Sequence, residues 1–153
     1  MTDVIIIMGS KSDMAHVEKI GAALAKFELS YQLCVASAHK SVQHLLELLA
    51  AFEAEASPKV YITVAGRSNA LSGMVDANVV APVIACPPYS EAFGGGDIFS
   101  TIRMPSGVAP ALVLEPANAA LLAAKILGRR EQVKKLQQDQ TEQLVRDHQA
   151  VKG

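Results

Sequence analysis

The chain has no tryptophan and few other aromatic residues, with three tyrosines and four phenylalanines among 153 residues. Half of its residues are hydrophobic, so a single domain of ordinary size can form a core from Ala, Val, Ile and Leu. Flavin-binding electron carriers normally stack aromatic side chains on the flavin ring. This composition therefore argues against that class of protein.

Excess charge and long apolar runs are also missing. The formal net charge is −1, which gives no electrostatic reason to expect nucleic acid or an acidic membrane as a partner. No apolar run approaches the roughly 18 to 20 residues that a membrane helix needs. The first nine residues lack the basic region, long apolar region and cleavage site of a secretory signal. We expect a cytoplasmic protein.

Cysteine is scarce, and both residues of this type, Cys34 and Cys86, lie inside apolar runs. A single disulfide stays open at this point, but buried reduced thiols are favoured for a chain without a secretory signal. Neither cysteine is a candidate nucleophile. No histidine has metal-ligand spacing with another histidine or a cysteine, so we expect no metal and no cofactor.

Short β-branched runs alternate with amphipathic stretches along the chain. The predicted strands are 4–8, 31–36, 60–65, 82–86 and 111–114, and the predicted helices are 14–27, 42–56, a short one ending at Val79, one or two turns in 97–104, and 117–127. This alternation predicts a three-layer α/β/α flavodoxin-like parallel sheet with strand order 2-1-3-4-5. Ligands of such sheets bind beyond the carboxyl ends of the strands, where strands 1 and 3 meet.

The composition changes after Gly128. Residues 1–128 form the predicted α/β domain, whereas 129–153 read as a polar helical tail with a thin apolar stripe. Such a helix rarely packs well alone, so we expect it to lie on a neighbouring subunit of a homo-oligomer. Its apolar positions are Val133, Leu136, Leu144 and Val145.

The first polar segment follows the first strand. Gly9 allows a sharp turn, Ser10 and Ser12 supply hydroxyl groups, and the next helix offers free N–H groups to a phosphate. Asp13 would repel a phosphate, so a ribose hydroxyl is its expected partner. The alternative is that Ser12 or Asp13 only caps the helix.

The second polar segment, Ser37-Ala38-His39-Lys40, follows the second strand. A histidine at this end of a strand can titrate near neutral pH and move protons, although most lone histidines are structural or solvated. Lys40 offers a cation for a phosphate or carboxylate. His16 and His44 are expected on solvated helix faces.

The third polar segment follows the third strand, where Gly66 and Gly73 frame a run of small polar residues. Backbone N–H groups in such a loop can approach a small anionic or polarised group. The alternative is an ordinary turn that caps the next helix. The candidate binding residues here are Gly66, Ser68, Asn69, Ala70 and Leu71. A phosphate-sensing receiver domain needs an Asp after this strand, and Ala65-Gly66 stands there instead.

Four motifs in order, MGSKSD, SAHK, AGRSNALSG and RMPSGVAPALVLEPANAALLAAKIL, resemble the aminoimidazole ribonucleotide carboxylase and mutase family of purine synthesis. The resemblance covers roughly residues 3 to 127. It implies 5-aminoimidazole ribonucleotide (AIR) and CO2 as substrates, His39 and Lys40 as catalytic residues, and a homo-octamer, with a tetramer as the alternative. The ribose phosphate would then contact Gly9, Ser10, Ser12, Asp13, Ser37 and Ala38.

The family has two branches. The mutase branch moves a carboxylate from the exocyclic nitrogen to ring carbon 4, and typically carries SAHRTP and a third loop like AGGAAHLPG. Here Lys40 replaces the Arg, and Asn69-Ala70 stands where the mutase loop has Ala-His, so the second His is missing. This pattern resembles the branch that adds free CO2 to carbon 4. Ser41-Val42 departs from the usual Thr-Pro or Gly-Pro, which suggests only a different helix start.

Overall fold

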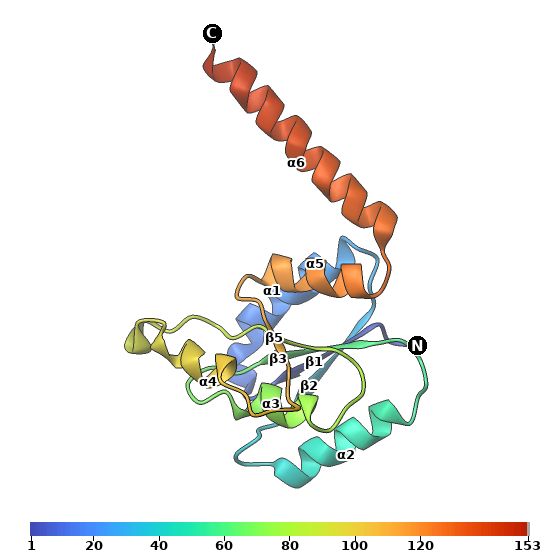
Figure 1. Cartoon of the computed structure of the whole chain (residues 1–153), viewed down its shortest axis with the longest axis vertical. Coiled ribbons are helices and arrows are strands. Elements are labelled where there is room, and N and C mark those ends of the chain that lie inside the picture. The colour runs from blue at the N-terminus through green and yellow to red at the C-terminus, as the bar shows by residue number, and fades with distance from the viewer. Residues whose placement is uncertain (153) are drawn as a thin grey trace.

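The computed structural model describes residues 1–152 as a parallel sheet between two layers of helices, from which one long helix projects (Figure 1). The strands are β1 Val4–Met8, β2 Tyr31–Val35, β3 Val60–Val64, β4 Val83–Ala85 and β5 Ala111–Leu112. They are ordered β2-β1-β3-β4-β5, and all neighbouring pairs are parallel. The predicted fold class and strand order are confirmed.

The helices follow the predicted alternation, with ends shifted by a few residues. They are α1 Met14–Ala25, α2 Val42–Glu53, α3 Ala70–Asp76, α4 Phe99–Ile102, α5 Pro116–Ile126 and α6 Arg130–Val151. Three short 3₁₀ helices complete the set: η1 Lys11–Asp13, η2 Glu91–Phe93 and η3 Gly96–Ile98. The polar segment after β1 is therefore ordered as η1.

Two apolar cores lie on the two faces of the sheet. The alternate side chains of β1 separate them: Ile6 packs with α1 and α5, and Ile5 packs with α2 and α3. Every residue of β1 is at most 1 % exposed. Burying an aliphatic side chain of this size contributes about 1.5–3 kcal/mol, so the two central strands β1 and β3 anchor the domain.

The two cysteines lie on opposite faces of this sheet. Cys34 belongs to the core beside α2, whereas Cys86 belongs to the core beside α1 and α5. Both are free and buried, so the disulfide that the sequence left open is not formed. Burial raises the pKa of the Cys86 thiol to about 12, which leaves it protonated and unreactive at neutral pH.

The tail is helical over Arg130–Val151 and points away from the α/β body (Figure 1). Only its first turns contact that body. Val133 is buried, and Arg129 forms an ion pair with Asp3 across 3.2 Å. No described helix is both long enough and apolar enough to cross a membrane.

Candidate active site

A cleft of about 400 Å³ opens at the carboxyl ends of β1, β2 and β3, where the three polar segments meet. The chain runs from β1 to β2 on one side of β1 and then returns through α2 to β3 on the other side, and this reversal of direction creates the opening. Of the residues named from sequence, those that line the cleft are Gly9, Ser10, Ser12, Asp13, Ser37, Ala38, His39, Gly66, Ser68 and Leu71.

The first segment presents a carboxylate to the cleft. Ser10 caps η1, because its hydroxyl oxygen accepts a hydrogen bond from the N–H of Ser12 at 3.2 Å. The Ser12 hydroxyl also donates to Ser10, at 2.9 Å. Asp13 makes no capping hydrogen bond to α1. Its carboxylate is therefore not used by the helix and faces the cleft.

Partial burial has an electrostatic consequence for Asp13. Desolvation raises the pKa of its carboxyl group, and nearby His16 opposes this only in part. A carboxylate that is costly to ionise gains from a hydrogen-bond donor. A sugar hydroxyl is such a donor, and a phosphate would increase the cost.

The second segment is a tight turn built on Ser37. The Ser37 hydroxyl accepts hydrogen bonds from the backbone N–H groups of His39, at 3.3 Å, and Lys40, at 3.2 Å. The backbone N–H of Ser37 in turn donates to the Ser41 hydroxyl at 2.8 Å. These bonds fix the backbone that carries His39, while its side chain stays exposed at the cleft wall.

Lys40 follows His39 in this turn but lies outside the cleft. It is exposed and is not among the cleft-lining residues. The structure of the single chain therefore does not bring its ammonium group into contact with the cleft, unlike the neighbouring imidazole of His39.

The third segment differs from expectation at Asn69 and Ala70, which do not line the cleft. Asn69 is 2 % exposed, and its side-chain oxygen accepts from the N–H of Ser72 at 3.2 Å. Its amide nitrogen donates to the Thr101 hydroxyl at 2.9 Å. The Asn69 side chain thus caps α3, which is the alternative that the sequence left open for this loop.

The cleft also contains residues that the motifs did not assign. Arg67 lines it, and its guanidinium carbon lies 5.7 Å from the centre of the Phe93 ring. Tyr89 and Ser90, from the segment after β4, line the cleft as well. The residues of this segment form no recognisable motif, so its position after the end of a strand is the only feature of the sequence that could indicate a role in the site.

The sequence predicts His16 on a solvated helix face, and this prediction is wrong. His16 is half-buried, and its Nε2 atom donates to the backbone carbonyl of Cys86 at 3.0 Å. It lines a separate cavity beside the cleft, together with Lys19 and Glu115. Burial is the main factor that lowers its pKa, and Lys19 adds to it; the Cys86 carbonyl and two carboxylates oppose the shift.

Comparison with known proteins gives the family of this chain. Residues 3–146 match the family model described as AIR carboxylase. The phosphoribosylaminoimidazole carboxylase of Treponema denticola is 58 % identical over 125 residues, covering 82 % of this chain and 79 % of that protein. The enzyme of the same name from Archaeoglobus fulgidus is 54 % identical over 145 residues, covering 92 % of this chain and 79 % of the relative.

A longer relative carries a second activity in its name. The bifunctional phosphoribosylaminoimidazole carboxylase/succinocarboxamide synthetase of Mus musculus is 41 % identical over 125 residues, covering 82 % of this chain and 29 % of the mouse protein.

A solved structure also matches. The crystal structure of Treponema denticola PurE superimposes with a TM-score of 0.97 and 48 % identity, over the full length of both chains. The chain belongs to the AIR carboxylase family.

Proposed function

We propose that this member of the family adds free CO2 directly to ring carbon 4 of AIR, reversibly, as a step of purine synthesis. One observation carries the choice of branch. Of the four histidines in the chain, His39 is the one that lines the cleft. The loop after β3 has the buried cap Asn69 followed by Ala70, which stands at the position of the second mutase histidine. Neither the amide of Asn69 nor the methyl group of Ala70 can exchange a proton near neutral pH.

The ring chemistry needs little from the protein. Carbon 4 of an aminoimidazole is enamine-like, so its electron pair can form the new bond to the carbon of CO2 without ATP, biotin or a metal. The resulting tetrahedral carbon keeps its hydrogen beside a positively polarised ring. Loss of that proton restores the aromatic ring and leaves the 4-carboxylate.

His39 is the proposed carrier of this proton. Its imidazole would accept the proton from carbon 4 during carboxylation and return it during decarboxylation, and general acid–base catalysis of this kind contributes about 10²–10⁴-fold in rate. The turn built on Ser37 fixes the backbone on which the imidazole stands. The imidazole itself is exposed at the cleft wall, so it can reach the substrate.

The remaining segments would hold the two substrates together. Ser10, Ser12 and Ser37 supply hydroxyl groups for the ribose phosphate, and Asp13 accepts from a ribose hydroxyl. Ser68 and the backbone N–H groups of its loop would hold CO2 or the new carboxylate. Anchoring the remote phosphate uses binding energy to replace the entropic cost of bringing two reactants together.

The fate of labelled carbon tests the branch. The enzyme is given the nucleotide that carries its carboxylate on the exocyclic nitrogen, together with excess labelled bicarbonate. Direct carboxylation predicts a product labelled from the pool, after the nucleotide has broken down to AIR. A product that keeps its original carboxylate, formed as fast as product from AIR and CO2, would make this chain an N5-carboxyaminoimidazole ribonucleotide mutase.

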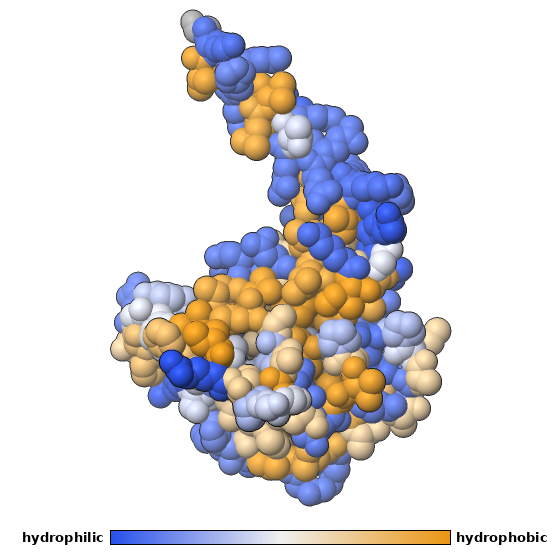
Figure 2. All heavy atoms as spheres, in the orientation of Figure 1, coloured by the Kyte–Doolittle hydropathy of each residue, from blue (hydrophilic) through white to orange (hydrophobic). Residues whose placement is uncertain are grey.

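We also propose that the chain works as a homo-oligomer, of eight subunits or of four, in which α6 packs on a neighbouring subunit. The support is the apolar stripe of α6: Leu144 is 69 % exposed and Val151 is 83 % exposed. Figure 2 shows hydrophobic groups along α6 and a broad apolar belt across the body below it. The two free buried thiols fit a cytoplasmic site of action.

A further inference from the structure

The loop between β3 and α3 has an unusual backbone at Arg67. This residue has φ +61°, in the left-handed region that side chains other than glycine seldom adopt. Glycine would adopt this conformation freely, whereas arginine needs outside contacts to hold it. The loop carries Gly66 and Ser68, which line the cleft.

The outside contacts come from a segment thirty residues later in the chain. The backbone N–H of Arg67 donates to the Asp97 carboxylate at 3.0 Å. The Ser100 hydroxyl lies 3.2 Å from the backbone carbonyl of Arg67, and accepts from the backbone N–H of Asn69 at 2.9 Å. The single proton of this hydroxyl is shared with the backbone carbonyl of Asp97, which lies closer, at 2.8 Å. The backbone N–H of Arg67 is thus held by η3, and Ser100 at the start of α4 holds the next turn of the loop through Asn69.

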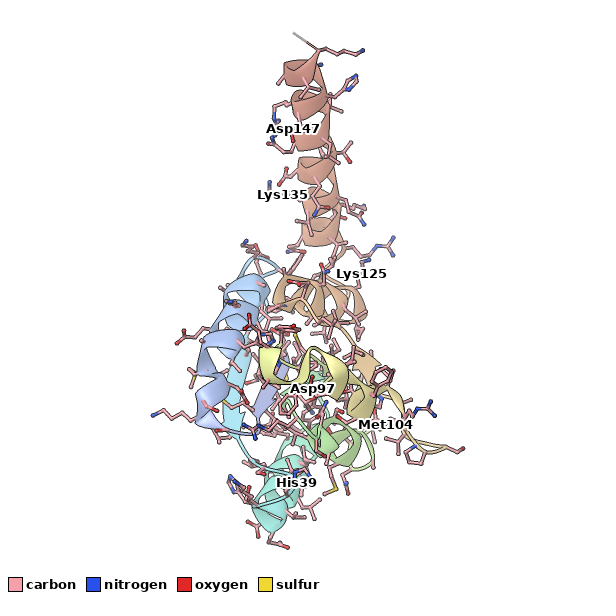
Figure 3. All side chains as sticks on the ribbon, turned by 90° about the vertical axis from the view of Figure 1, so that its left-hand side faces the viewer. His39, Asp97, Met104, Lys125, Lys135 and Asp147 are labelled. Atoms are coloured by element: carbon pink, nitrogen blue, oxygen red, sulfur yellow. The ribbon has the colours of Figure 1, made fainter. Side chains whose placement is uncertain are left out.

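Asp97 acts from behind the loop. It is not among the residues that line the cleft; it lines the neighbouring cavity with His16 and Lys19. Figure 3 shows Asp97 beside the short helices at η3 and α4, apart from His39 just before the start of α2. A substrate in the cleft would therefore meet the loop and not this carboxylate.

We propose that Asp97, assisted by Ser100, is a positioning residue that holds the β3–α3 loop in the shape that binds CO2 and the product carboxylate. Its charged acceptor directs the Arg67 N–H away from the cleft and keeps the left-handed turn, so that Ser68 and the following backbone face the substrate. The inference rests on the proposed function, since it assigns this loop to CO2.

Steady-state kinetics of the full-length enzyme test the role. Asp97→Ala should raise the KM for CO2 about fivefold or more, because loss of a hydrogen bond to a charged group changes an equilibrium by at least that much. The KM for AIR should stay within about twofold, since the AIR contacts proposed above lie on other segments. Asp97→Asn, which keeps an acceptor oxygen, should restore most of the CO2 affinity.

Glu91→Ala is the matched control, because Glu91 is an exposed carboxylate of the same β4–β5 segment and does not line the cleft. It should leave both KM values unchanged. A thermal unfolding curve for each variant shows whether it is folded at the assay temperature. An unchanged KM for CO2 in folded Asp97→Ala, or an equal rise in both KM values, would overturn the inference.

The wild-type enzyme separates this inference from the proposed function. Failure of the wild type to fix labelled CO2 would overturn the proposed function before any variant is compared. Normal fixation by the wild type, combined with an unaltered Asp97→Ala, would overturn the positioning role alone. Should Asp97→Ala fail to fold, Ser100→Ala removes the second contact and must show the same selective rise.

Discussion

The Nε2 atom of His16 lies 3.0 Å from the carbonyl oxygen of Cys86, which ties helix α1 to the end of strand β4. Because a carbonyl only accepts, the neutral ring must carry its proton on Nε2. Burial also disfavours the charged ring and lowers the pKa of His16. This contact joins the wall of the cleft that carries Asp13 to the wall that carries Pro88 and Tyr89.

A pH dependence of stability follows from this contact. The folded pKa of His16 is below its unfolded value of about 6.5, so the unfolded chain binds the proton more readily. Stability from this residue is present above pH 6.5 and is lost as the pH falls through that value toward the folded pKa. His16→Gln, which keeps a donor but does not titrate, should show a smaller drop in thermal midpoint between pH 7.5 and 5.5. An equal drop in both proteins would contradict this.

Asp13 should affect binding more than turnover. Asp13→Ala is expected to raise the KM for AIR about tenfold while kcat falls less than about threefold, because ribose binding is the same in the ground and transition states. Steady-state kinetics at saturating CO2 measure both constants. Losses of equal size in kcat and kcat/KM would show that Asp13 acts in the transition state.

Elements of the fold that depend on local sequence pattern are predicted well, whereas elements that depend on contacts between distant residues are not. Strand β1 was predicted to the residue, because a continuous apolar run buried on both faces has only one interpretation in an α/β pattern. Strand β5 is shorter than predicted, Ala111–Leu112 in place of 111–114. It is an edge strand and pairs with β4 over only two residues.

The same distinction holds for the candidate site. The predicted strand order alone correctly places the segments after β1, β2 and β3 around one cleft. The partners of His16 and Asn69 could not be predicted, because each contact joins residues more than thirty positions apart through loops without a pattern. A residue at the start of a helix can face the ligand or cap the helix, and only tertiary contacts decide between them.

The exposed stripe of α6 predicts a stable assembly. Light scattering of the full chain at micromolar concentration should give the mass of a tetramer or an octamer. Leu144→Lys with Val145→Lys places two charges on the stripe and should shift the mass toward smaller species. Gln149→Lys with Ala150→Lys adds the same charges to exposed positions on the opposite face of α6 and serves as the control. A monomeric wild-type chain would contradict the proposed role of α6.

The role of His39 as proton carrier is tested most directly by His39→Asn, with His44→Asn on the exposed face of α2 as its control. AIR binding, measured by calorimetry, should stay within about tenfold of wild type in both variants, because the phosphate contacts remain. Turnover should fall at least about 100-fold in His39→Asn, the lower limit for loss of a general acid–base group, and stay unchanged in His44→Asn. A His39→Asn enzyme that turns over within about tenfold of wild type would contradict the account.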